Sequence, residues 1–278
     1  MVLVLIQTSG RGRDRLNFAR RVAKHVGLLA EASIASTTWC LRPTRSSGCW
    51  RSTAFTWRRE YHEGHRANFS SVDLTGRDFS GLNLRGIKMD RALLSGADFT
   101  GAHLQSANLI GAIAERACFD RVDLSRARLS GANLVSASLK DACLARADME
   151  FALMANTVLR GACLREADMS GAQLDAVTLT GADLRKANLR GAGFRNARLD
   201  AADLRDARLG SAFLIGASLC GADLRGAYLR LARLDGADLS DANLDGVEGL
   251  TQDQLNRAHC NSGTTLPVCL TGVEDGKR

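Results

Sequence analysis

The stretch SGADFTGAHLQSANLIGA, residues 95–112, repeats one short pattern every five residues. Its large apolar residues Phe99, Leu104 and Leu109 are five positions apart, and each follows an alanine by two positions. The residue before each of them is Asp, His or Asn. The question is which structure has a period of five.

The pattern extends far beyond this stretch without a slip in phase. From Phe69 to Leu244 in steps of five, 35 of 36 positions hold Leu, Phe or Met, and the exception is Ala114. The unit is Ala, then Asp or Asn, then Leu, then any residue, then often Gly. An internal repeat that covers about two thirds of a chain decides its architecture.

A period of five excludes both regular secondary structures. An α-helix turns about 100° per residue, so residues five apart scatter around it and form no stripe. In a flat strand, side chains alternate between faces, so an odd period sends successive centres to opposite sides. All centres share one interior only if the chain bends once per unit, which makes a solenoid.

Departures from the consensus indicate how many sides close one coil. If four units make a coil, residues 20 apart lie above one another, and Phe79, Phe99 and Phe119 form one interior stack. Three units per coil would break this series, so we predict four sides. At about 4.8 Å per coil, about nine coils give a rod roughly 43 Å long.

The inward positions of a narrow tube explain the unusual composition, with only 5% aromatic residues. A small residue must alternate with a large one there, and burying each Leu contributes roughly 2 kcal/mol. Arg77, Leu82 and Ile87 are large residues at the position two before the central residue, which the repeat otherwise fills with a small one. We call this position the small slot. We interpret them as a wider or frayed first coil, with a buried functional Arg77 as the alternative.

Three segments carry the repeat most clearly: GADLRKANLRGAGF (181–194), GADLRGAYL (221–229) and GADLSDANLDG (236–246). They resemble the A-(D/N)-L-x-x units of pentapeptide-repeat proteins, and the resemblance covers residues 67–248. It implies an all-β fold, a right-handed quadrilateral β-helix with the central Leu or Phe and the preceding Ala pointing inward.

Residues 1–66 share none of this regularity. They carry 12 Lys and Arg against 4 Asp and Glu, and all three tryptophans. Residues 14–32 could form a basic helix, so a membrane-binding or nucleic-acid-binding arm and a transit peptide are alternatives. We expect a basic, irregular or disordered extension.

Residues 249–278 are predicted to hold a short capping helix and a tail. Thr251 is the expected N-cap, Gln254 its capping-box partner, and Leu250 with Leu255 the hydrophobic staple. Such a helix would cover the open edge of the last coil. The combination resembles the tail of many bacterial members of the family.

The sequence offers no chemical centre. Metalloprotease, nucleophile-elbow, phosphate-loop and dinucleotide motifs are absent from a supporting context, so we expect no enzymatic activity, cofactor or metal site. The eight cysteines form no C-x-x-C pair. We expect Cys143 and Cys163 to be neighbouring free thiols, with a redox disulfide as the alternative, and a cytoplasmic protein without a membrane span.

Two outer surfaces are candidate sites. One is a column of arginines that could contact phosphates or pair with the aspartates two residues earlier: Arg165, Arg185, Arg205 and Arg225. The other is a set of apolar residues in outward slots on one edge, which suggests a contact surface for another subunit, a protein partner or the N-terminal segment: Leu93, Ile110, Ile113, Val135, Phe151, Leu153, Phe213, Ile215 and Leu231.

These surfaces favour a non-catalytic scaffold that binds an unidentified protein or a second copy of itself. The resemblance also implies an alternative, because some family members mimic DNA, bind DNA gyrase and protect it from fluoroquinolones. Such mimicry needs a strongly negative rod, but residues 67–248 carry 22 basic against 23 acidic residues. Non-specific nucleic-acid binding through the basic segment and the arginine column is the second alternative.

Overall fold

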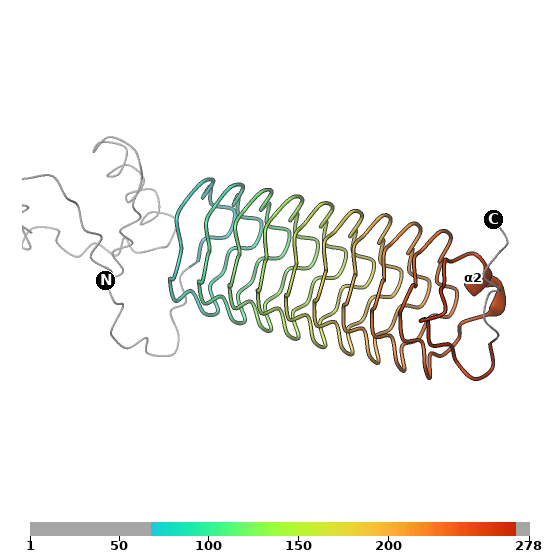
Figure 1. The fold of residues 1–278 in the computed structure, drawn as a ribbon. Helices are drawn as coiled ribbons and strands as arrows, with labels where there is room; N and C mark the ends of the chain where they lie inside the picture. Colours follow the sequence, from blue (N-terminus) through green and yellow to red (C-terminus); the bar gives the residue numbers. More distant parts are fainter. Residues whose placement is uncertain (1–67, 271–278) are drawn as a thin grey trace, which may run out of the picture.

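The computed structural model describes residues 68–270 as a straight rod of stacked coils (Figure 1). The chain winds along the rod from its N-terminal end, and one α-helix of the described part, α2 (Gln252–Asn256), lies at the opposite end. The expected N-terminal extension and the basic helix over residues 14–32 fall outside the described residues. The predicted domain boundaries therefore stay predictions.

Four sides close each coil, as the sequence predicts. Parallel bridges pair residues 20 positions apart along the repeat, for example Asp98 with Cys118. The rings of Phe79 and Phe99 stack with centroids 4.8 Å apart and planes 7° apart, and Phe99 stacks on Phe119 in the same way. The columns therefore run almost straight along the rod.

The β-pairing between neighbouring coils is shorter than the predicted all-β fold suggests. The Phe99 amide donates to the Cys118 carbonyl at 2.7 Å, and the Cys118 amide donates to the Ala97 carbonyl at 2.9 Å. The Ala102 amide then donates back to the Phe99 carbonyl, which closes a turn. Because a five-residue side gives most of its length to this turn, residues 68–270 contain single-residue bridges and no continuous strand.

The turn also explains the acidic and glycine positions of the repeat. The Asp98 carboxylate accepts a hydrogen bond from the Thr100 amide at 2.8 Å, an Asx-turn that fixes the bend. Gly101 follows with φ of +64°, a left-handed conformation that glycine adopts without steric cost. Asp or Asn before the centre and Gly after it therefore shape the corner.

The interior consists of the two predicted ladders. From Ala92 to Leu244 nearly all small-slot alanines and central leucines are almost fully buried, and Ala114 is 2% exposed beside the equally buried Phe119. Near the start the packing is looser, since Arg77 and Leu82 are half-buried whereas Ile87 is buried. The first coil therefore departs from the regular burial pattern at Arg77 and Leu82 but not at Ile87, and its greater width stays a prediction.

Helix α2 begins where the sequence predicts. The Thr251 hydroxyl accepts a hydrogen bond from the Gln254 amide, and the Gln254 side chain accepts one from the Thr251 amide, so the capping box is confirmed. Leu250 and Leu255 both join the buried apolar cluster. Gln254 Nε2 also donates to the carbonyls of Leu229 and Ala232, at 3.0 and 2.7 Å.

Candidate interaction surfaces

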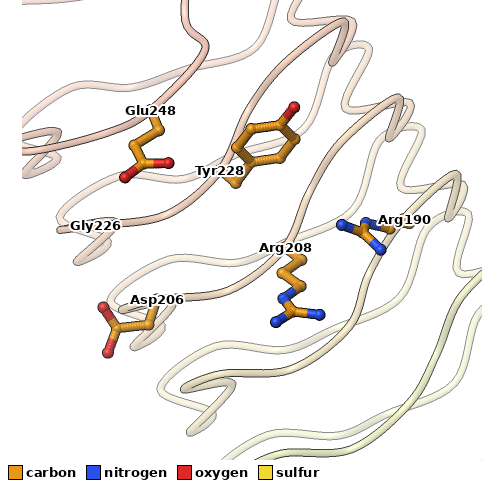
Figure 2. Close-up of a pocket in the computed structure, with 6 residues that line it drawn as sticks. All are labelled: Arg190, Asp206, Arg208, Gly226, Tyr228 and Glu248. Carbon is orange, nitrogen blue, oxygen red and sulfur yellow. The ribbon is translucent and has the colours of Figure 1, made fainter.

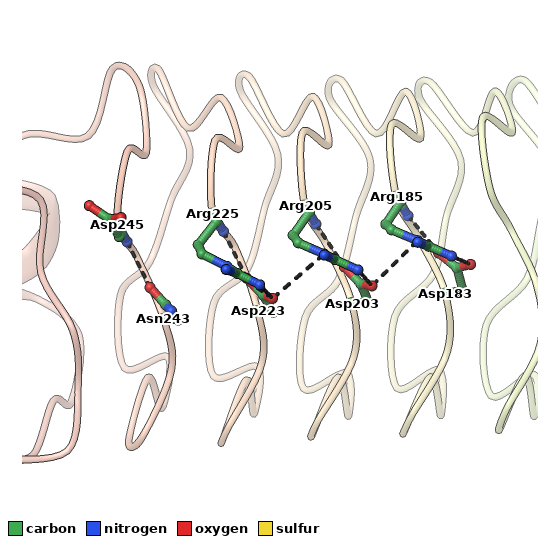
Figure 3. A network of polar contacts seen from close by, with 8 residues as sticks. All are labelled: Asp183, Arg185, Asp203, Arg205, Asp223, Arg225, Asn243 and Asp245. Carbon is green, nitrogen blue, oxygen red and sulfur yellow. Dashed lines mark hydrogen bonds and ion pairs between the residues drawn. The ribbon is translucent and has the colours of Figure 1, made fainter.

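Three of the four column arginines form a continuous ladder of ion pairs with aspartates (Figure 3). Arg185 Nη2 lies 2.6 Å from Asp183 of its own side, and Arg185 Nε lies 3.4 Å from Asp203 on the next coil. Arg205 repeats both contacts, with Asp203 and Asp223, whereas Arg225 pairs only with Asp223 of its own side. The ladder therefore links coils as well as neutralising its own charges.

The ladder lowers the pKa of two of its aspartates, Asp183 and Asp223. Hydrogen bonds from the Arg185 guanidinium hold the pKa of Asp183 below its usual value, and those from Arg225 do the same for Asp223. Both carboxylates are therefore ionised at neutral pH, and the ion pairs of the three arginines leave little net positive charge along this part of the column. Of the two alternatives for these three arginines, the ion pairs favour the salt-bridge ladder.

Arg165 differs because Cys163 stands where the ladder would place an aspartate. Within residues 68–270 Arg165 makes no ion pair, and it lines a shallow, open groove with Arg85, Arg126 and Arg146. Arg146 Nε is 2.8 Å from Glu166 in the same groove. Arg165 was a predicted site residue, but the groove around it was not predicted from the sequence.

A second open groove lies toward the C-terminal end of the rod (Figure 2). It mixes charges and an aromatic ring, and its lining residues are Arg190, Asp206, Arg208, Gly226, Tyr228 and Glu248. The Tyr228 ring covers Gly210, where an added Cβ would lie 3.2 Å from Tyr228 Cε1. The sequence signal for this groove was Tyr228, a bulky aromatic residue in a column of polar residues, but the groove was not predicted from it.

The nine outward apolar residues form what we call the apolar stripe. Residues Leu93, Ile113, Leu153 and Phe213 occupy one column of bridge residues, as the pairing of Leu93 with Ile113 and the later bridges establish. Phe151 and Leu231 share the corner column beside it and are 67% and 70% exposed. Leu93 and Ile113 are each 39% exposed, and the other five members are half-buried.

Two contacts within the stripe restrict its aromatic rings. Phe151 has φ of +54°, and its ring lies over Gly171, where an added Cβ would come within 2.5 Å of the ring. The Arg195 guanidinium lies 5.2 Å from the centroid of the Phe213 ring. A positive φ is unfavourable for a bulky residue, and Phe151 remains largely exposed in this conformation.

The paired cysteines lie on the same side of the rod as the ladder. Cys143 and Cys163 are bridge partners on adjacent coils, and both are free thiols. Burial raises the pKa of Cys143, and the nearby Asp123 carboxylate adds to the effect. The thiol form is therefore favoured over the reactive thiolate.

In the described part of the chain, no three His, Cys, Asp or Glu side chains gather closely enough to hold a metal ion. No helix among residues 68–270 is long and apolar enough to cross a membrane.

A family model described as pentapeptide repeats matches this chain in 8 copies over residues 67–210 and 212–247. HetL, a pentapeptide repeat protein involved in heterocyst differentiation regulation in the cyanobacterium Nostoc sp. strain PCC 7120, is 31% identical. The alignment covers 73% of this chain and 86% of HetL, with a TM-score of 0.45.

Two further solved structures show more distant similarity. QnrB1, a plasmid-mediated fluoroquinolone resistance protein, is 22% identical over 64% of this chain and 86% of its own, with a TM-score of 0.47. A pentapeptide repeat protein of the Arabidopsis thaliana thylakoid lumen is 28% identical over 46% of this chain and 70% of its own, with a TM-score of 0.15. The search of curated proteins gave no match.

Proposed function

This chain belongs to the pentapeptide repeat family, and from that premise we propose that it is a non-catalytic scaffold that binds protein along the faces of its solenoid. The observation that carries the proposal is the apolar stripe. Phe151 and Leu231 are mostly exposed at corners where the other coils place Gly, Ser or, at position 91, Arg. Apolar side chains that add little to the core, gathered on one edge, are typical of a contact surface.

The scaffold as proposed has nine coils and a capped C-terminal end in a bacterial cytoplasm. The hydrogen bonds from Gln254 to two carbonyls of the preceding coil support the cap, because they satisfy acceptors at an open edge. The cysteines among residues 68–270 are free thiols, which supports a reducing compartment.

Affinity capture from the native host tests the proposal. The bait variant Phe151→Ser with Leu231→Ser removes the two most exposed side chains of the stripe. Ser211 in the same column, with φ of +58°, is a precedent for serine at this corner. Lys140→Ser, an exposed change on another side, is the matched control. We expect the bound protein to be lost from the double variant only. Equal capture by all three baits would contradict the proposal.

DNA mimicry toward gyrase is the alternative that the family suggests, and the charge of this solenoid disfavours it. QnrB1 is, by its name, a fluoroquinolone resistance protein. Here 22 basic residues stand against 23 acidic ones in residues 67–248, and three column arginines are paired with aspartates. A supercoiling assay with purified gyrase is expected to show no effect of the protein.

Nucleic-acid binding has one favourable observation, the groove that Arg85, Arg126, Arg146 and Arg165 line. A DNA shift assay titrated with salt tests it, since phosphate contacts weaken steeply as salt rises. Arg126→Ser with Arg165→Ser should weaken any such binding, whereas Arg205→Ser in the ladder should not. Equal weakening by both changes would place the contact elsewhere.

A further inference from the structure

Cys143 and Cys163 lie side by side on neighbouring coils of the rod. The Leu144 amide donates to the Cys163 carbonyl at 2.7 Å, and the Cys163 amide donates to the Ala142 carbonyl at 2.9 Å. These hydrogen bonds form a parallel bridge that sets Cys163 directly opposite Cys143. The two side chains therefore leave the rod on the same side and in register. Both are half-buried, so an ion from solvent can reach them.

The spacing between coils sets the distance between the two thiols. Phenylalanine rings of successive coils are 4.8 Å apart, and equivalent atoms of Cys143 and Cys163 are separated by about the same distance, the usual spacing of paired strands. A disulfide needs its two Cβ atoms within about 3.5–4.5 Å of each other. Because backbone hydrogen bonds hold the coils together on every side, a disulfide would require two coils to move closer.

One ion between the two sulfurs fits this spacing better than a direct bond does. A bond from a thiolate to Zn²⁺ is about 2.3 Å long, so two bonds of this length in line span roughly 4.6 Å. Zinc sites and iron–sulfur clusters need four protein ligands, or three and a water. Among residues 68–270 no three His, Cys, Asp or Glu side chains gather closely enough for such a site. Of the metals that thiolates select, Cu(I) remains, and it is stable with two ligands in line.

The carboxylates beside the pair already have partners. Asp123 and Asp183 are the next residues of the same column on either side of the two cysteines. The Asp123 carboxylate accepts a hydrogen bond from the Gln105 side chain at 2.6 Å. Asp183 is paired with Arg185 at 2.6 Å. The two sulfurs are therefore the ligands that this part of the column offers.

Positive charge lies next to the pair. In the ladder each arginine stands two residues after the aspartate that it pairs with, and Arg165 stands in this relation to Cys163 (Figure 3). The pKa of Asp183, lowered mainly by Arg185, is lowered further by the charge of Arg165. The pKa of Arg185, raised mainly by Asp183, is raised further by Cys163. Two guanidinium groups therefore lie where they offset the charge of a pair of thiolates.

The free thiols are mainly protonated. Burial raises the pKa of Cys143, although a hydrogen bond from the Ala145 amide to its sulfur acts in the opposite direction. That hydrogen bond also orients the sulfur, as the amide of the second following residue does for an aspartate of the ladder. A bound ion must displace the thiol protons, so its affinity should rise with pH.

We propose that Cys143 and Cys163 together bind one Cu(I) ion as a linear bis-thiolate site. On binding, two S–H bonds break, two protons pass to solvent and two copper–sulfur bonds form, with no transfer of electrons. The site goes beyond the scaffold function and does not depend on it. For these two thiols it replaces the expectation of no metal site, which was based on motif spacing along the chain.

Anaerobic titration of the reduced full chain with Cu(I), in competition with a colorimetric Cu(I) chelator, tests the site. We expect the wild type to retain one copper that Cys143→Ser and Cys163→Ser each lose. Cys118→Ser is the matched control, because Cys118 is also half-buried but its bridge partners are Asp98 and Ser138. This variant should retain the copper. A circular dichroism spectrum confirms that each variant keeps its fold.

A full-chain variant with serine at every cysteine except Cys143 and Cys163 removes the background of the other thiols. It should bind one Cu(I) per chain, and X-ray absorption at the copper edge should show two sulfur ligands. Its affinity should rise about 100-fold per pH unit below the thiol pKa values, because two protons are released. Arg165→Glu should weaken binding several-fold, since it removes a positive charge beside the thiolates.

Four results would overturn the proposal. They are equal copper retention by the wild type and Cys143→Ser, one copper held between two chains, a copper ion with a third protein ligand, and a Cys143–Cys163 disulfide that forms under mild oxidation of the metal-free chain. None of them bears on the scaffold function, which is tested through Phe151 and Leu231 on a different part of the surface.

Discussion

Phe99 and Phe119 stack with ring centroids 4.8 Å apart and planes 2° apart, although 20 residues separate them in the chain. The distance equals the strand spacing between coils. Phe99 therefore fills its own coil and contacts the rings of Phe79 and Phe119 in the coils on either side, so the interior consists of columns of stacked side chains rather than a globular core.

Removing one ring from that column should open a cavity. Phe99→Ala is expected to lower the free energy of unfolding by about 3–5 kcal/mol, because the neighbouring coils are held at fixed spacing and cannot collapse into the space. Phe99→Leu inserts the commonest central residue of the repeat and should cost less than about 1.5 kcal/mol. Urea unfolding followed by circular dichroism measures both, and equal losses would contradict the column packing.

Enlarging a small slot should be equally harmful. Ala182 is 1% exposed inside the tube, so Ala182→Leu forces extra methylene groups against packed neighbours and should cost at least 1–3 kcal/mol. Ala145→Leu, at an outward turn position that lines the basic groove, is the control and should be close to neutral. Urea unfolding measures the stability of both variants. An unchanged stability of Ala182→Leu would mean that the interior of the tube is not closely packed at this position.

The arginine ladder predicts a pH dependence. The pKa of Asp183 is lowered chiefly by its hydrogen bonds with Arg185, so the native state binds a proton less readily than the unfolded chain does. This stabilisation is complete above the ordinary aspartate pKa of about 3.9 and is lost as the pH falls through the lower native value. Asp183→Asn should therefore flatten the acid part of the stability profile.

The effect of Asp183→Asn at neutral pH should be about 0.2–1 kcal/mol, because the pair is partly exposed to solvent. Asp206→Asn is a suitable control, since Asp206 makes no ion pair among the described residues. Unfolding curves between pH 2 and 7 measure the difference. Identical profiles for wild type and Asp183→Asn would show that the ladder contributes nothing to stability.

The cysteines should differ in their rates of alkylation. Cys269 is exposed, whereas burial raises the pKa of Cys143 and so reduces its thiolate fraction. Iodoacetamide at pH 7.5, followed by peptide mass spectrometry, should modify Cys269 several-fold faster. Equal rates would contradict the protected thiol, and a peptide in which Cys143 is joined to Cys163 would show that the pair is oxidised.

The sequence predicts the fold from residues that repeat at one spacing. Phe79, Phe99 and Phe119 indicate four sides per coil because a stack of identical side chains needs identical positions, and the structure confirms the stack. The number of residues in β-pairing was harder to predict from the sequence. The pattern of the repeat gives the bend but not how many residues of a side pair with the next coil.

The surfaces were predictable in position but not in detail. The nine stripe residues fall on one edge because the lag of 20 residues fixes their columns. Their exposure depends on neighbours, as where Arg195 lies over the ring of Phe213. Likewise, the link from Arg185 to Asp203 on the next coil depends on side-chain rotamers, which periodicity does not determine.

The two residues of the C-terminal capping box, Thr251 and Gln254, make different hydrogen bonds and should therefore differ in their effect on stability. Thr251→Ala removes a hydrogen bond to the Gln254 amide and should cost about 1 kcal/mol. Gln254→Ala also removes the donors to the carbonyls of Leu229 and Ala232, which belong to the preceding coil. Because unsatisfied acceptors add their own cost, this change should be more harmful and should loosen that coil. Hydrogen exchange of the Tyr228 and Arg233 amides should then accelerate in Gln254→Ala more than in Thr251→Ala. If exchange rises equally in both variants, the bonds to the coil contribute nothing beyond the helix cap.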